Sequence, residues 1–122
     1  LDLSGEYPSL KLIRGVEHMG SLVLTQLKRV LDAYAARNVD EAMEVWRRDE
    51  EIDAMCVSLF RELLTYMAED PKQITPCTHL LFMAKNIERI GDHATNIAEN
   101  TWFLVHGETL SEKREKRDST SQ

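Results

Sequence analysis

The fold is decided by residues 75–107, which have the sequence TPCTHLLFMAKNIERIGDHATNIAENTWFLVHG. Thr75 followed by Pro76 is typical of a helix start, with Thr as the N-cap and Pro at the first helical position, and Gly107 is a typical stop. Apolar residues recur between these limits at steps of three and four, namely Leu80, Met83, Ile87, Ile90, Ala94, Ile97, Thr101 and Leu104. This spacing predicts one amphipathic helix over about residues 75–106.

Two earlier segments have the same periodicity. The first covers about residues 8–37, where Pro8 suits a first helical turn. The second covers about residues 39–69; Asn38 with Glu41 forms a capping arrangement at its start, and the proline after Asp70 ends it. Three long helices joined by short links predict an all-α fold, an antiparallel three-helix bundle over residues 1–107.

The composition suits one globular domain. The chain has 122 residues, of which 43% are hydrophobic, and a formal net charge of −6. An acidic chain lacks the basic surface of a general nucleic-acid binder, and no run approaches the roughly 20 apolar residues of a membrane span. Cys56 and Cys77 form no CxxC pair and are expected to be reduced, partly buried thiols of a cytoplasmic protein.

The ends of the chain differ from its body. Residues 108–122 carry acids and bases that cancel, so we expect a charged, flexible C-terminal tail and place the whole net charge on the helices. The chain begins with Leu1 rather than Met, which suggests a fragment of a longer protein.

Carboxylates interrupt the apolar pattern on two of the predicted helices. Asp49 and Asp53 lie in the apolar stripe of the helix over residues 39–69. Glu88 and Asp92 are four residues apart and share a face of the helix over residues 75–106. Gly91 lies beside that second pair, and a glycine within a helix suggests close approach by another group.

Two pairs of like charges require compensation. Carboxylate oxygens favour Mg²⁺, Ca²⁺, Mn²⁺ or iron over soft metals, so the four acids are candidate metal ligands. The alternative is that they pair with Arg47, Arg48 or Arg89, or are simply exposed to water.

The run NIERIGDHATNIAE, residues 86–99, resembles the PhoU family of bacterial phosphate-signalling regulators. Residues 40–53, 61–67 and 102–108 are also similar to that family. The resemblance covers about residues 8–108 and implies the second, C-terminal bundle of a protein built from two three-helix bundles in tandem. By itself such a half is expected to expose apolar surface around Val16, Leu24 or Trp46.

The resemblance also implies site residues and partners. The family's (Glu/Asp)-x-x-x-Asp motifs fall on Asp49 with Asp53 and on Glu88 with Asp92, and imply bound divalent or iron-type metal ions; Asn96 and Glu99 extend the same face and rank lower as ligands. The implied function is non-enzymatic: an adaptor, possible homodimer, between a phosphate-responsive sensor histidine kinase and the ATPase subunit of the phosphate ABC transporter. It would be peripheral to these membrane complexes and act negatively when phosphate is plentiful.

Two other classes stay open at this point. A carboxylate-bridged di-iron enzyme would use Glu-x-x-His repeats and a fourth helix, neither of which the sequence shows at suitable positions. A purely structural, self-associating helical bundle would bind no stoichiometric metal.

Overall fold

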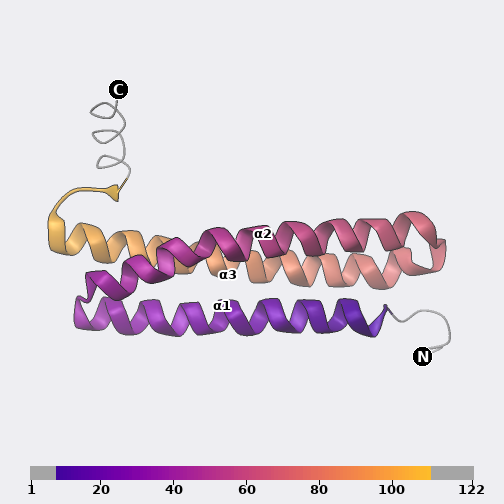
Figure 1. Ribbon diagram of the computed structural model, residues 1–122, viewed down its shortest axis with the longest axis horizontal. Helices are drawn as coiled ribbons and strands as arrows, with labels where there is room; N and C mark the ends of the chain where they lie inside the picture. Colours follow the sequence, from indigo (N-terminus) through magenta and orange to yellow (C-terminus); the bar gives the residue numbers. More distant parts are fainter. Residues whose placement is uncertain (1–7, 111–122) are drawn as a thin grey trace, which may run out of the picture.

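Three long helices form the molecule. The computed structural model describes residues 8–110 and contains α1 (Leu10–Ala36), α2 (Val39–Glu69), the short 3₁₀ helix η1 (Pro71–Gln73) and α3 (Ile74–His106). Each long helix reverses the direction of the one before it and packs against both others (Figure 1). The predicted all-α, antiparallel three-helix bundle is therefore confirmed.

Local side-chain chemistry sets the helix ends that the sequence predicted. The Asn38 side chain accepts a hydrogen bond from the Glu41 amide at 3.1 Å and so caps α2. That helix ends at Glu69, and Asp70 before the proline has extended backbone angles. Gly107 ends α3 with a φ of 73°, a conformation that costs glycine little.

The capping residues predicted for two helix starts are wrong, although both helices begin within about two residues of the expected positions. α1 begins at Leu10 rather than in a turn that includes Pro8, because the Ser9 side chain accepts from the Lys11 amide at 3.2 Å and acts as the cap. α3 begins at Ile74, directly after η1, so Thr75 and Pro76 lie inside the helix. The Asp70 carboxylate starts η1 by accepting from the Lys72 amide at 3.1 Å.

The buried core is divided into two clusters along the bundle. The first cluster contains Leu12, Val16, Met19, Val23, Ile52, Cys56, Leu59, Leu63, Cys77, Leu80 and Ala84. The second cluster contains Val30, Ala33, Ala42, Met43, Val45, Ala94, Ala98, Trp102 and Leu110. Between them, each helix contributes a residue without a large apolar side chain: Gln26, Asp49 and Gly91. We call these three residues the middle layer.

The apolar stripes predicted from the sequence are wider than the buried faces. Val16 is buried, which contradicts its expected exposure, and Trp46 is half-buried. Leu24 is 59% exposed, as expected. Met83 and Leu104, predicted to belong to the core stripe of α3, are also about half exposed.

The structure bears on the predicted tail only at its start. Residues 111–122 of the predicted segment 108–122 lie outside the described residues. Leu110 is 9% exposed and packs in the second cluster, so the packed body continues past residue 107. Over residues 8–110, no helix has an apolar stretch long enough to cross a membrane.

Candidate metal centre

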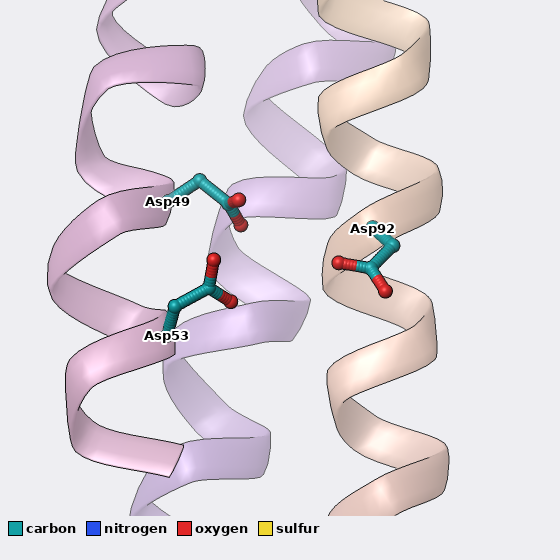
Figure 2. A group of neighbouring side chains, drawn as sticks. All are labelled: Asp49, Asp53 and Asp92. Carbon is teal, nitrogen blue, oxygen red and sulfur yellow. The ribbon is translucent and has the colours of Figure 1, made fainter. Parts of the chain in front are cut away.

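Three of the four predicted ligands come together beside the middle layer. Asp49 and Asp53 lie one turn apart on α2, and Asp92 faces them from α3 (Figure 2). One carboxylate oxygen from each lies within 4.8 Å of the others. The four-residue spacing puts Asp49 and Asp53 on one side of α2, and the packing of α2 on α3 adds the third. We call these three residues the carboxylate group.

Glu88 is outside this group. Its carboxylate lies 3.6 Å from the Lys85 ammonium, three residues earlier on α3. The same ammonium lies 4.3 Å from the ring centroid of Phe60 on α2. The predicted ligand Glu88 therefore already has a cationic partner, which the sequence spacing of the acids did not indicate.

Within the part of the chain that the structure describes, the carboxylate group has no such cationic partner. Among residues 8–110, no lysine or arginine forms an ion pair with Asp49, Asp53 or Asp92. Arg47 is close along the chain but pairs with Glu44 at 2.9 Å. The alternative in which arginines neutralise these acids is thus not realised within that range.

Burial and mutual repulsion change the acidity of two members. Burial, with the charges of Asp53 and Asp92, raises the pKa of Asp49 to about 6, and a Thr95 hydrogen bond opposes part of this rise. The same hydroxyl is 3.2 Å from the Gly91 carbonyl, so its one proton is shared between two acceptors. The pKa of Asp53 is also raised, by burial and by Asp92. A nearby cation would relieve this repulsion.

An open cleft of about 410 Å³ lies over the carboxylate group, lined by Trp46, Arg47, Asp49, Glu50, Asp53, Thr95 and Glu99. Glu99, which the sequence ranked as a secondary candidate, therefore borders the site, whereas Asn96 is exposed and absent from the lining. Glu50 also borders the cleft.

Gly91 brings α1 into the site from behind. A methyl group at this position would lie 3.8 Å from Asp49 Oδ1 and 3.8 Å from Val23 Cγ2. These are ordinary contact distances. The close approach predicted from the glycine is therefore made by the Asp49 and Val23 side chains, and it leaves room for one further carbon atom at Gly91. Val23 thus supports the rear of the carboxylate group.

Cys56 lies on α2, three residues after Asp53, and is fully buried. Its Sγ lies 3.4 Å from the Met19 Sδ. Burial, followed by the charges of Glu88 and Asp53, raises the pKa of this thiol to about 12. Among the described residues, the ligand atoms that converge here are the carboxylate oxygens of Asp49, Asp53 and Asp92, and Cys56 is not one of this group.

The carboxylate group fits a hard cation. An ion roughly 2.3–2.6 Å from two ligands on opposite sides holds them roughly 4.6–5.2 Å apart, which the 4.8 Å span already approaches. Three carboxylates and an open cleft leave further coordination positions for water, as Mg²⁺ and Ca²⁺ require.

Sequence reasoning missed Gln26. The buried positions of α1 are Leu12, Val16, Met19, Val23, Gln26, Val30 and Ala33, which alternate steps of four and three. A glutamine within that repeat was the available signal.

Fold and site together define a class: an all-helical bundle that carries carboxylates suited to a hard cation in a cleft between two helices. Residues 16–101 match the PhoU domain. This chain therefore belongs to the PhoU family.

Individual relatives agree with this assignment. A phosphate-specific transport system accessory protein PhoU homolog from Rhizobium meliloti (strain 1021) is 62% identical over 111 residues, which are 91% of this chain and 47% of the relative. A homolog of the same name from Caulobacter vibrioides is 56% identical over 94% of this chain and 50% of the relative. The crystal structure of PhoU from Pseudomonas aeruginosa matches with a TM-score of 0.73 and 40% identity, over 75% of this chain and 44% of that one. The chain thus spans about half the length of the curated relatives it matches.

Proposed function

We propose that this chain is a non-enzymatic regulatory module of bacterial phosphate uptake. The observation that carries this proposal is its 62% identity, over 91% of its length, to a protein named as an accessory of the phosphate-specific transport system. Its relatives are named accessory proteins, which supports a regulatory role for this chain.

In this proposal the module is an adaptor. One partner is the ATPase subunit of the phosphate ABC transporter and the other is a phosphate-responsive sensor histidine kinase, whose response the module represses when phosphate is plentiful. Large apolar side chains at the surface, such as Leu24, Phe82 and Phe103, offer contact area for partners.

Metal occupancy of the carboxylate group adjusts the charge of the surface that the adaptor presents. Asp49, Asp53 and Asp92 would hold a divalent or iron-type ion, and Glu88 would join them only by leaving Lys85. Neutralising the group changes the electrostatic field over the cleft between α2 and α3, and therefore which charged partner surface fits it.

The first experiment measures metal binding. Mn²⁺ titrated into the chain by calorimetry is expected to bind stoichiometrically, and Asp49→Asn is expected to weaken binding at least 100-fold because it removes the central, most buried ligand. Glu51→Gln is the matched control: it removes one charge from α2 at a residue that lines the hollow between α1 and α2, and should change the affinity less than threefold. Absence of binding by the unsubstituted chain to Mn²⁺, Mg²⁺ and Fe²⁺ would reject the metal part of the proposal.

The second experiment measures partner binding. Asp49→Ala combined with Asp92→Ala is expected to alter the affinity for the kinase and for the transporter ATPase, each measured with and without Mn²⁺. If the double variant binds both partners as tightly as the unsubstituted chain, metal-dependent docking is wrong. If the unsubstituted chain binds neither partner, the adaptor role of this module is wrong.

A further inference from the structure

Gln26 is an unusual residue in the core of this bundle. It is 5% exposed, and within residues 8–110 only Thr101 is another buried polar side chain. The Thr101 hydroxyl bonds to the Ile97 carbonyl of its own helix at 2.8 Å. Gln26 instead bonds to the backbone of a different helix, so its hydrogen bond constrains how α1 and α2 meet.

Both ends of the Gln26 amide are used. Its Nε2 donates to the Val45 carbonyl of α2 at 3.3 Å, and its Oε1 accepts from Arg29 Nη1 at 3.2 Å. Arg29 Nε in turn lies 2.6 Å from the Glu41 carboxylate at the start of α2. This interhelical network fixes the orientation of the amide, because Arg29 can bond only to its oxygen and Val45 only to its nitrogen.

The anchored turn of α2 is the one that precedes the carboxylate group. In an α-helix the Val45 carbonyl also accepts the amide of the residue four positions later, which is Asp49. Glu41, Val45, Asp49 and Asp53 occupy successive turns of α2. A displacement of α2 at Val45 would therefore carry Asp49 and Asp53 with it.

The same region of α1 also packs against the rear of the carboxylate group. Val23 lies one turn before Gln26. Its side chain and Asp49 Oδ1 both lie close to the position that a methyl group at Gly91 would occupy. Gln26 and Asp49 both belong to the middle layer, where the two apolar clusters are interrupted. An apolar residue at position 26 would connect the two apolar clusters, but it would not fix the axial position of α2 relative to α1.

We propose that Gln26 is a positioning residue for the carboxylate group: its amide holds the Val45 turn of α2 so that Asp49 and Asp53 face Asp92 at metal-binding distance. This inference rests on the proposed metal-binding function. It implies that α1, which contributes no metal ligand, nevertheless contributes to the affinity for the metal ion.

The test separates positioning from stability. Gln26→Met keeps the length of the side chain and restores the apolar repeat, so its melting temperature should equal or exceed that of the unsubstituted chain. Its Kd for Mn²⁺, measured by calorimetry on the whole 122-residue chain, should nevertheless rise about tenfold, the usual loss when a group that orients a ligand is removed. A Kd within twofold of the unsubstituted value would overturn the inference.

Val30→Ala is the matched control. Val30 is fully buried in the next position of the same stripe on α1 and takes no part in the interhelical network. This substitution should lower the melting temperature but leave the Kd for Mn²⁺ within twofold at 10 °C. If Val30→Ala weakens Mn²⁺ binding as much as Gln26→Met does, affinity follows general stability and Gln26 has no positioning role.

A measurement without metal gives a second readout. The backbone amide of Asp49 shares its carbonyl acceptor with the Gln26 side chain, so Gln26→Met should shift the Asp49 amide proton resonance. The shift at Ile52 should be smaller, because its acceptor, the Arg48 carbonyl, is neither of the two hydrogen-bond partners of the Gln26 amide. Equal shifts at the two amides would count against the inference. If the unsubstituted chain binds no Mn²⁺, both the metal function and this role fail; if it binds and Gln26→Met binds equally, only this role fails.

Discussion

Two polar groups meet at the middle layer, and their charges and hydrogen bonds are satisfied to very different degrees. In the interhelical network, Gln26, Arg29 and Glu41 satisfy one another and the Val45 carbonyl. In the carboxylate group, three like charges converge and, within the described range, meet no base. The first arrangement stabilises the metal-free protein and the second destabilises it. The paired acid Glu41 thus helps to hold α1 and α2 together, whereas the three unpaired acids are the ones to which the proposed function assigns a cation.

The largest expected effect tests the interhelical network. Arg29→Met removes the 2.6 Å pair with Glu41 and the donor to Gln26, so the free energy of unfolding in urea should fall by about 1–2 kcal/mol. The control is Arg47→Met, which breaks the more exposed pair with Glu44 and should cost less than about 0.5 kcal/mol. Equal losses for the two variants would remove the distinction between the network and an ordinary surface pair.

The next largest effect concerns the carboxylate group, where removing a charge should raise rather than lower the free energy of unfolding. Because the pKa of Asp49 is about 6 in the folded chain and 3.8 in its reference state, the folded chain binds the proton more tightly. In chelator, this group should contribute stability below about pH 4 that is lost as the pH rises through 6, amounting to about 1 kcal/mol after solvent screening.

Subtracting a reference variant isolates that effect. Asp49→Asn should be more stable than the unsubstituted chain above pH 6 and should lack this component of the pH dependence, measured by urea unfolding from pH 4 to 7. Saturating Mn²⁺ at pH 7 should reverse the order of the two proteins. A constant difference across this pH range in chelator would show that folding does not raise the pKa of Asp49.

The smallest effect tests how tightly the middle layer is packed. Gly91→Ala should stabilise the chain by about 0.5–1 kcal/mol, because the helix gains an alanine and the methyl group fits at 3.8 Å from its neighbours. Gly15→Ala should gain less, since its methyl group would lie 3.1 Å from Leu59 Cδ1. Thermal unfolding measures both. A destabilised Gly91→Ala would mean that the layer has no spare room.

The sequence was sufficient for the fold because the information is local. Steps of three and four, the Asn38 cap and the glycine at 107 each act within a turn or two of helix. The start of α3 was mispredicted because η1 depends on the Asp70 side chain, which competes with the Thr-Pro signal. Asp49 and Asp53 could be paired from spacing, but the position of Asp92 relative to them depends on how α2 packs on α3.

Glu88 shows the limit of spacing most directly. Glu88 and Asp92 have the same sequence separation as Asp49 and Asp53. The Glu88 carboxylate nevertheless pairs with the Lys85 ammonium, which also lies over the Phe60 ring. Gln26 shows the converse, since its importance comes from a hydrogen bond to a residue nineteen positions away.

The two buried thiols can report how often different parts of the bundle open. Cys56 lies at the level of the acids and Cys77 near the beginning of α3; both are fully enclosed, and burial raises the pKa of each. A thiol reagent can therefore reach either sulfur only while that part of the bundle is open. The labelling rate at Cys56 reports openings of α2 beside the carboxylate group, and the rate at Cys77 reports openings at the far end of the bundle. Comparing the two rates with and without Mn²⁺ would tell whether the proposed ion stabilises the whole bundle or only its middle.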